Sequence, residues 1–304
     1  MIKCPLTGST NVKIIYEQKS VPLIQNKVYA TKEQAVNAPC IDVILAQSLH
    51  NGFVFSANFN ESIIDYDAAY QNEQSNSVYF RQHLEHVIEI MRNNNTLNGK
   101  VVEIGCGKAY FLEMLLDRGV NITGFDPTYE GHSTKVVKDF FSDKYSDIGA
   151  EFIILRHTLE HIAHPFNFIK TIAAANKHKG KIYIEVPTFD WITAHNATED
   201  IFYEHCNYFT LATLQMLFTK STGGHFFNGQ YFYVIADLAD VKSALEPQTI
   251  TPYEIKFKDR INEYDKLISG LKNTAIWGAG AKGSTFLNLL DKECKKVKCV
   301  VDIN

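Results

Sequence analysis

The chain has 304 residues, of which 45% are apolar and 21% are charged, and this composition is ordinary for a soluble protein with room for two domains. A formal net charge of -4 and a pI near 6.3 argue against binding to a nucleic-acid backbone. No apolar run is long enough for a membrane span and no secretory leader is recognisable, so we expect a cytoplasmic protein without membrane or nucleic-acid partners.

Residues 1–62 form an irregular segment with the outline of a zinc-binding unit. The stretches Cys4–Gly8 and Ser48–Gly52 follow the spacing of two zinc knuckles, each of which would read Cys-x-x-Cys-Gly. Structural zinc needs four thiolate or imidazole ligands. Only Cys4 is a thiol, because the other three ligand positions are occupied by Thr7, Ser48 and Asn51. The sequence therefore predicts a degenerate knuckle and no metal.

Residues 63–242 are expected to form the central domain, which begins with a polar stretch and a helix. Tyr70 and Gln74 lie in the polar stretch, where several hydrogen-bonding groups could close over a cofactor or substrate, although a solvated loop is the alternative. Ser75 or Ser77 can cap the helix that follows. The apolar face of that helix would consist of Phe80, Leu84, Val87, Ile88 and Met91.

The stretch Lys100–Pro127 predicts a strand, a glycine turn, a helix and a second strand. Lys100–Ile104 is a short apolar run, and the glycines of Gly105-Cys106-Gly107 allow a sharp turn and the close approach of a ligand. A helix over Tyr110–Arg118 should end at Gly119. The second strand then leads to Asp126, where an acid can accept hydrogen bonds from ribose hydroxyls.

Two kinds of cofactor use this arrangement, and the residue types distinguish them. A dinucleotide site needs a small residue three positions after the second glycine, whereas this chain has the bulky Tyr110. Glu103, two residues before Gly105, would repel a pyrophosphate but suits a cationic amino-acid moiety. The pattern therefore predicts S-adenosylmethionine, with an NAD-dependent oxidoreductase as the rival reading.

The next strands should bring more polar groups to the same edge of the sheet. A third strand over Lys135–Phe141 would end in Asp139-Phe140-Phe141, a carboxylate and two rings suited to an adenine. A fourth strand over Glu151–His157 runs directly into a short acid and imidazole cluster. That cluster consists of His157, Glu160 and His161, and open α/β sheets place their ligands at this edge.

A second stretch of acid, imidazole and phenol side chains follows the fifth expected strand, Lys181–Val186. Tyr203, Glu204 and His205 are adjacent in a loop before a helix capped by Thr210. Enolisation and proton transfer need such groups, because a histidine titrates near neutral pH and a neighbouring acid or phenol can orient it. We therefore predict His205 as the general base and Glu204 as its orienting group, with Tyr203 as part of a wall that excludes water.

Residues 243–304 should contain a linker, a helix and a second glycine motif. Gly278-Ala-Gly280-Ala-Lys-Gly283 satisfies Gly-x-Gly-x-x-Gly, with a late acid at Asp302. One βαβ unit cannot bury both faces of its sheet. We therefore expect either a longer natural product or a truncated copy, and whether this unit binds a nucleotide stays open.

With these motifs, the chain resembles bacterial sugar C-methyltransferases, which have a zinc-knuckle N-terminal segment, a class I methyltransferase domain and a C-terminal Rossmann-like domain. The resemblance rests on Tyr70–Gln74, Glu103–Gly107, Leu155–His161, Tyr203–Phe209 and Trp277–Gly283. It implies a Rossmann-like α/β fold and S-adenosylmethionine as cofactor. The expected cofactor-binding residues are Glu103, Gly105, Cys106, Gly107, Phe111, Asp126, Pro127, Asp139, Phe140, Phe141, Arg156, Tyr70 and Gln74. The expected catalytic residues are His205, Glu204, His161, His157 and Tyr203.

The same resemblance implies a methyl transfer to a carbon next to the ketone of a nucleotide-linked keto-deoxysugar, with His161 or His157 stabilising charge on the ketone. Two alternatives stay open at this point. One is O- or N-methylation of another small molecule, which needs a base but no ketone recognition. The other is a truncated, non-catalytic binding protein.

Overall fold

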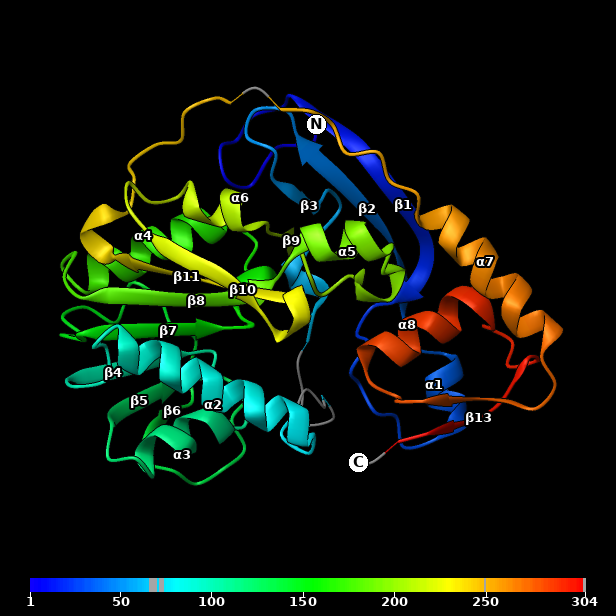
Figure 1. Ribbon diagram of the computed structural model, residues 1–304, viewed down its shortest axis with the longest axis horizontal. Helices are drawn as coiled ribbons and strands as arrows, with labels where there is room; N and C mark the ends of the chain where they lie inside the picture. The colour runs from blue at the N-terminus through cyan, green and yellow to red at the C-terminus, as the bar shows by residue number, and fades with distance from the viewer. Residues whose placement is uncertain (66–69, 71–73, 249, 303–304) are drawn as a thin grey trace.

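The computed structural model describes residues 1–65, 70, 74–248 and 250–302, and their strands form three sheets. The largest has seven strands in the order β10-β11-β8-β7-β4-β5-β6 (Figure 1). Strands β4 to β8 are parallel to one another, whereas β11 runs antiparallel between β8 and β10. The bounds are β4 Lys100–Ile104, β5 Asn121–Phe125, β6 Val136–Val137, β7 Phe152–Arg156, β8 Lys181–Pro187, β10 Thr222–Phe226 and β11 Tyr231–Asp237. This architecture confirms the predicted Rossmann-like α/β fold class.

Helices cover both faces of this sheet because its buried strands are apolar on both sides. Val101 packs in one core with α2 and α3, and its neighbour Val102 packs in another core with α4. Successive side chains of a strand point to opposite faces, which accounts for this division. These helices are α2 Val78–Asn93, α3 Tyr110–Leu116 and α4 Pro165–Ala175, with α5 Phe189–His195 and α6 Leu211–Gln215 in the later connections. Short 3-10 turns are η2 Leu159–His161, η3 Thr198–Asp200, η4 Phe227–Gly229 and η5 Leu238–Asp240.

The predicted third strand is much shorter than expected. Only Val136–Val137 pairs with β5, whereas the sequence predicted a strand over Lys135–Phe141. The chain turns away after β6, because the Asp139 amide donates to the Val137 carbonyl at 2.9 Å and the Asp139 carboxylate accepts from Tyr145. The adenine residues expected on this strand therefore lie in a loop.

The N-terminal segment forms a second, antiparallel sheet in the order β1-β2-β3-β9. Its first three strands are β1 Val12–Pro22, β2 Cys40–Ser48 and β3 Val54–Ser56, with α1 Lys32–Val36 and η1 Glu61–Ile63. The fourth strand, β9 Asn207–Tyr208, belongs to the loop that carries His205. The N-terminal sheet thus fixes one end of that loop.

Both degenerate knuckles form their expected turns, although three of the four ligand positions are not thiols. The amide of Gly8 donates to the Cys4 carbonyl and the amide of Gly52 to the Ser48 carbonyl, each at 2.8 Å. The Asn51 side chain reaches the buried Cys4 sulfur at 4.0 Å. An amide therefore faces the thiol where a second metal ligand would be needed.

The C-terminal segment contains α7 Phe257–Gly270 and a parallel pair of strands, β12 Thr274–Trp277 and β13 Val297–Val301, joined by α8 Ala281–Leu290. Figure 1 shows this unit beside the seven-stranded sheet and below the N-terminal strands β1 and β2. The Ala281 amide, at the start of α8, donates to the Asn26 side chain at 2.9 Å. Lys282 pairs with Asp200 at 3.0 Å. The second glycine motif is therefore attached to both preceding parts of the chain.

We predict that the purified protein contains no zinc, because Cys4 is the sole thiol among the four knuckle positions and a single thiolate does not hold structural zinc. Elemental analysis after preparation in chelator-free buffer measures this. One equivalent of zinc that is lost in a Cys4→Ser variant, but kept in a Cys40→Ser variant, would contradict the prediction.

Candidate active site

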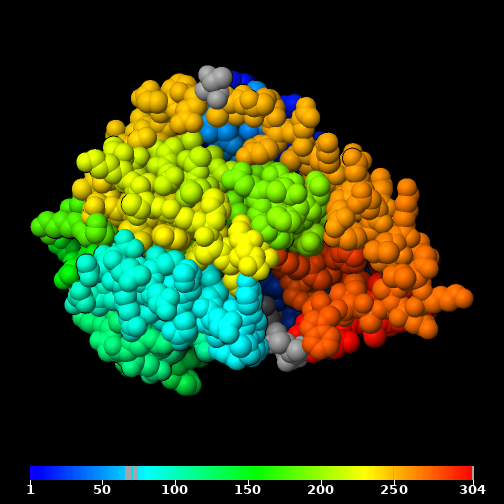
Figure 2. Space-filling model, viewed as in Figure 1, coloured from blue at the N-terminus to red at the C-terminus, as the bar shows by residue number. Residues whose placement is uncertain are grey.

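A cavity of about 560 Å³ opens at the carboxyl ends of β4, β7 and β8. The space-filling view shows a hollow between the segment coloured cyan and the orange and red C-terminal segment (Figure 2). The first glycine turn, the His157 and His205 segments and the second glycine motif all contribute to its wall. This volume is typical of a small-molecule site. The cavity therefore joins both glycine motifs and the predicted catalytic histidines.

The first glycine turn has no room for a side chain at Gly105. Gly105 has a φ of +77°, and a Cβ built there would lie 2.2 Å from the Thr158 hydroxyl oxygen. Gly107 also has a positive φ, of 53°, and its amide donates to the Asp126 carboxylate at 2.8 Å. Gly105, Cys106 and Gly107 all line the cavity.

Glu103 is a buried acid at the end of β4 that faces the cavity. Its side chain is 2% exposed, and its Oε2 has no hydrogen-bond partner within the described residues. Burial raises the pKa of Glu103 to about 7, against the opposing effect of Arg156. A buried carboxyl with an unsatisfied oxygen is suited to a cationic ligand group, because a cation would stabilise its ionised form.

Arg156 and Phe111 form one wall of the cavity and hold each other in place. The Arg156 guanidinium lies 4.4 Å from the centre of the Phe111 ring, and its Nε donates to Glu185 at 2.8 Å. Both line the cavity. The charge of Arg156 is already paired with that of Glu185.

Five predicted cofactor residues do not line this cavity. Asp126 accepts from the Gly107 amide and from the Thr128 amide and hydroxyl, so its carboxylate braces the glycine turn. Asp139 pairs with Lys144 and Tyr145, whereas Phe140 is 71% exposed. The five residues outside the cavity wall are Asp126, Pro127, Asp139, Phe140 and the buried Phe141.

The polar stretch before α2 contributes two residues to the cavity wall, Tyr70 and Gln74. The residues between them, 71–73, lie outside the described residues. Burial and the nearby Glu204 raise the pKa of Tyr70, whose hydroxyl is hydrogen-bonded to Glu204 and Asn26. Tyr70 thus connects the polar stretch to the N-terminal segment and to the loop that carries His205.

His161 and His205 face each other in the cavity. Their ring centres are 4.8 Å apart at an interplanar angle of 78°. The Nδ1 of His161 lies 2.9 Å from the Glu204 carbonyl, which fixes Nδ1 as the protonated nitrogen of the neutral ring. Burial lowers the pKa of both histidines, that of His205 well below its ordinary value. Both rings are therefore neutral near pH 7, as proton acceptors must be.

Glu204 and Tyr203 lie outside the cavity, whereas the sequence predicted that Glu204 orients His205 and that Tyr203 forms part of a wall around the substrate. The Glu204 carboxylate accepts from the Gln25 amide at 2.7 Å, and Glu204 acts on the histidines through its carbonyl, toward His161. Tyr203 is fully buried, and its hydroxyl donates to the Asn58 carbonyl and accepts from the Asn60 amide. Neither residue lines the cavity, so Tyr203 joins the loop to the N-terminal segment and does not form a wall around a substrate.

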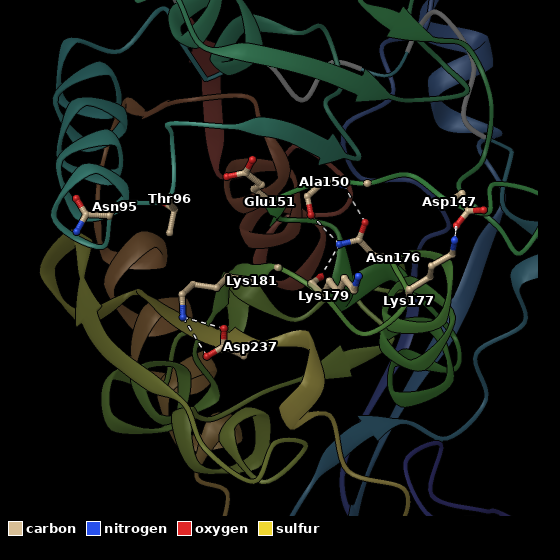
Figure 3. A pocket seen from close by; sticks show the side chains of 12 residues that line it. Asn95, Thr96, Asp147, Ala150, Glu151, Asn176, Lys177, Lys179, Lys181 and Asp237 are labelled. Atoms are coloured by element: carbon tan, nitrogen blue, oxygen red, sulfur yellow. Dashed lines mark hydrogen bonds and ion pairs between the residues drawn. The ribbon is translucent and has the colours of Figure 1, made fainter.

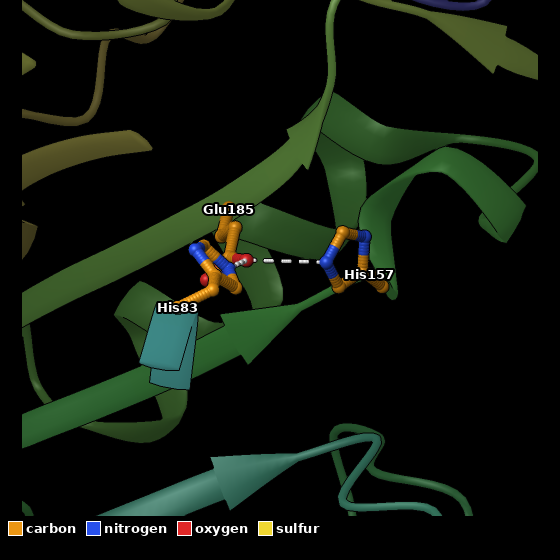
Figure 4. A group of neighbouring side chains, drawn as sticks. All are labelled: His83, His157 and Glu185. Carbon is orange, nitrogen blue, oxygen red and sulfur yellow. Dashed lines mark hydrogen bonds and ion pairs between the residues drawn. The ribbon is translucent and has the colours of Figure 1, made fainter. Parts of the chain in front are cut away.

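The sequence reasoning missed the polar cluster beneath the cavity. Glu185 on β8 accepts from His83 of α2 at 2.7 Å and from His157 at 3.1 Å (Figure 4). An acid inside the apolar run of β8 and a histidine on the apolar face of α2 were the available signals. A side chain that is buried at such positions needs a polar partner, and here each partner is another element of the domain.

Comparison with known families gives one match in this part of the chain. Residues 79–223 match the model of a methyltransferase domain. These residues are therefore similar to a methyltransferase domain. The match supports a methyltransferase enzyme with S-adenosylmethionine as its cofactor, in agreement with the sequence prediction. Comparison with curated proteins gives no match.

Several solved structures are similar to the methyltransferase domain. A methyltransferase from Archaeoglobus fulgidus is 18% identical, covers 52% of this chain and 99% of its own, and has a TM-score of 0.41. A protein from Pyrococcus horikoshii is 14% identical, with 58% and 94% covered and a TM-score of 0.41. One from Methanosarcina mazei is 15% identical, with 48% and 95% covered and a TM-score of 0.37. Likenesses this weak say nothing about the acceptor.

A second cavity, of about 530 Å³, lies at the opposite edge of the methyltransferase domain's sheet. Figure 3 shows that its charged groups pair with one another, Lys181 with Asp237 at 2.9 Å and Lys177 with Asp147. It is lined by the amino ends of β7 and β8, away from the glycine turn.

No helix in the described part of the chain is long and apolar enough to cross a membrane.

We predict that S-adenosylmethionine binds more weakly at pH 6 than at pH 8 and releases a proton when it binds at pH 6. The pKa of Glu103 is about 7, so its carboxyl is mostly protonated at pH 6 and must ionise to pair with a cationic amino group. Affinity should fall about tenfold for each pH unit below 7. Calorimetry in two buffers of different ionisation enthalpy measures both effects.

Glu103→Gln should weaken binding and remove this pH dependence, whereas Glu113→Gln, on the exposed face of α3, should keep both. An unchanged pH dependence in the Glu103→Gln protein would exclude Glu103 as the linked group.

Proposed function

We propose that the chain transfers the methyl group of S-adenosylmethionine to a carbon next to the ketone of a nucleotide-linked keto-deoxysugar. One observation carries this proposal. A single cavity has the unsatisfied carboxyl of Glu103 in one wall and the His161–His205 pair in another. The acid is suited to the cationic cofactor, and a neutral imidazole is suited to remove a proton from the acceptor.

The cofactor end of the proposal uses the first glycine turn. Glu103 would pair with the amino group of S-adenosylmethionine, and Gly105 and Gly107 would let its backbone approach. Phe111 and Arg156 offer a flat wall for the rest of the cofactor. Asp126, which braces the turn, and Phe140, which is exposed beyond it, are the candidates for ribose and adenine. When bound, the cofactor supplies a sulfonium methyl group that needs no further activation.

The acceptor end needs a base and a positive charge, because a carbon next to a ketone becomes a nucleophile when it loses a proton. His205 is neutral at pH 7 and lines the cavity, so it is suited to accept that proton. His157 also lines the cavity, and Glu160 and Glu185 raise its pKa to about 9 against the effect of burial. A protonated His157 would stabilise the negative charge that develops on the ketone oxygen.

The C-terminal wall of the cavity supports an acceptor larger than a bare sugar. Trp277 is 76% exposed beside the second glycine turn and lines the same cavity, which places a flat aromatic surface within reach of a nucleobase. Lys108 also lines the cavity and could face a diphosphate. The amides of Ala279 and Ala281 already donate to Asp302 and Asn26, so this glycine turn offers less to a pyrophosphate than its sequence suggests.

O- or N-methylation is the second candidate, because it would use the same cofactor and the same base. It needs no positive charge next to a ketone, and the protonated His157 in the wall favours carbon methylation. NMR assignment of the methyl position in the product separates the two. A product methylated on oxygen or nitrogen would exclude the carbon transfer.

We expect calorimetric titration to give binding of S-adenosylmethionine and S-adenosylhomocysteine and no response to NAD, because Glu103 repels a pyrophosphate and Tyr110 prevents close helix packing. Heat with NAD and none with S-adenosylmethionine would refute the methyltransferase proposal and favour an oxidoreductase. Binding without turnover of any keto-sugar nucleotide would favour the non-catalytic alternative.

We predict that His205→Ala lowers turnover by about a hundredfold to ten-thousandfold, the usual contribution of general-base catalysis, and leaves S-adenosylmethionine affinity nearly unchanged. His178→Ala, at an exposed site at the opposite edge of the sheet, is the control. Deuterium exchange at the substrate carbon, without methyl donor, isolates the proton step. Exchange at the wild-type rate in the His205→Ala protein would exclude His205 as the base and make His161 the next candidate.

A further inference from the structure

His157 lies between two buried carboxylates that belong to different elements. Its Nε2 is 3.1 Å from Glu185 on β8, and its Nδ1 is 3.5 Å from Glu160 in η2. The backbone at His157 has a φ of 49°, in the left-handed region that favours glycine. A bulky residue keeps this conformation when its surroundings hold it there. Both ring nitrogens of His157 are therefore directed by the two acids.

The Glu185 side of this arrangement is rigid and fully buried. Glu185 is 0% exposed and accepts from Arg156, His83 and Tyr183 in addition to His157. Figure 4 shows His83 and His157 converging on this one carboxylate from α2 and from the end of β7. Arg156 and the two histidines hold the pKa of Glu185 well below its ordinary value, although burial opposes them. Glu185 is thus a fixed anion that orients the His157 ring.

The Glu160 side is open to the cavity. Glu160 is 2% exposed and lines the cavity, and within the described residues its carboxylate oxygens have no hydrogen-bond partner. The Glu160 carbonyl accepts from the Cys206 amide at 2.9 Å, which ties η2 to the His205 loop. One carboxylate oxygen of Glu160 and one ring nitrogen each of His161 and His205 lie within 4.8 Å of one another. The titratable groups facing this carboxylate are His157, His161, His205, Tyr70, Cys206 and Tyr231.

We propose that Glu160 is a further residue of the active site, the carboxylate that stabilises the imidazolium formed on His205 during proton transfer. Glu185 is a positioning residue, since it acts on the reacting ring through His157 and Glu160. This inference rests on the proposed function for the identity of the base, and it adds the counter-charge that this base lacks. Without a neighbouring anion, a buried imidazole resists protonation, because burial penalises its charged form.

The proton balance of the step is simple. The acceptor C–H bond breaks, its proton goes to His205 and its electron pair stays on the acceptor as the enolate. The positive charge then lies on the His161–His205 pair, beside the Glu160 carboxylate. The enolate carbon forms a bond to the methyl group as the bond from methyl to sulfur breaks, and the proton leaves His205 for solvent. His157 stays protonated throughout, because both of its nitrogens face carboxylates.

The first test needs neither acceptor nor cofactor. Histidine-labelled full-length protein is titrated by NMR from pH 5 to 10, and the His157 signal is assigned by its loss in a His157→Gln protein. We expect His157 to stay protonated through pH 8 and its pKa to fall by about one unit or more in Glu160→Gln, since a neighbouring opposite charge shifts a pKa by that amount. Glu89→Gln removes the acid of the exposed His86–Glu89 pair and should leave the His157 signal unchanged.

His157 titrating below pH 7 in the wild-type protein, or an unchanged His157 pKa in Glu160→Gln, would overturn the proposal. So would one equivalent of Mn²⁺ or Zn²⁺ bound by the wild-type protein but not by Glu160→Gln, because the carboxylate would then be a metal ligand. Glu160→Asp keeps the charge and should restore most of the His157 shift if Glu160→Gln proves unstable.

The second test measures function. Glu160→Gln should lower kcat about tenfold to a hundredfold with little change in KM, and should move the acid limb of the pH profile to lower pH, because the base loses the anion that favours its protonated form. A loss of activity with an unmoved acid limb would indicate a structural role and overturn the proposal. If the NMR result holds but no keto-sugar nucleotide exchanges deuterium, the proposed acceptor fails and the position of Glu160 beside His157 stands.

Discussion

The buried carboxylate of Glu185 is the interaction on which the site depends. It has no contact with solvent, and a charge in that position is tolerated only when it is fully paired and hydrogen-bonded. Its partners are Arg156 and His157 at the end of β7, Tyr183 on its own strand and His83 on α2. One anion therefore fixes a wall of the cavity and the orientation of His157 at the same time.

The parts of the fold that follow from local sequence pattern could be predicted. The apolar run Lys100–Ile104 before a glycine turn gave β4 and its turn, and the helical spacing of Phe80, Leu84 and Val87 gave α2. Glu103 before the glycine turn favoured S-adenosylmethionine over NAD, because its negative charge suits a cationic ligand and repels a pyrophosphate. Such features depend on neighbours within one element, so periodicity is enough to find them.

The parts that depend on contacts distant in sequence could not be predicted. Tyr203 looked like a substrate residue because it adjoins Glu204 and His205, yet its hydroxyl bonds to the N-terminal segment near residue 60. Glu204 orients His161 through its backbone carbonyl, an atom that every residue type offers. The partners of Asp139 turned an expected strand into a loop. In each case, the deciding partner belongs to another element, and no spacing rule names it.

The strand β9 has a consequence for how the chain folds. Because Asn207–Tyr208 completes a sheet whose other strands lie within residues 12–56, and because Gln25 bonds Glu204, the loop that carries His205 is held by contacts between residues that lie far apart in the sequence. Contacts of such wide sequence separation cost loop-closure entropy before they return any stabilisation, so they form late. The parallel sheet with the cofactor turn has contacts closer in sequence and can assemble during synthesis. The part of the cavity wall that the second glycine motif forms must wait until residues near 281 have left the ribosome.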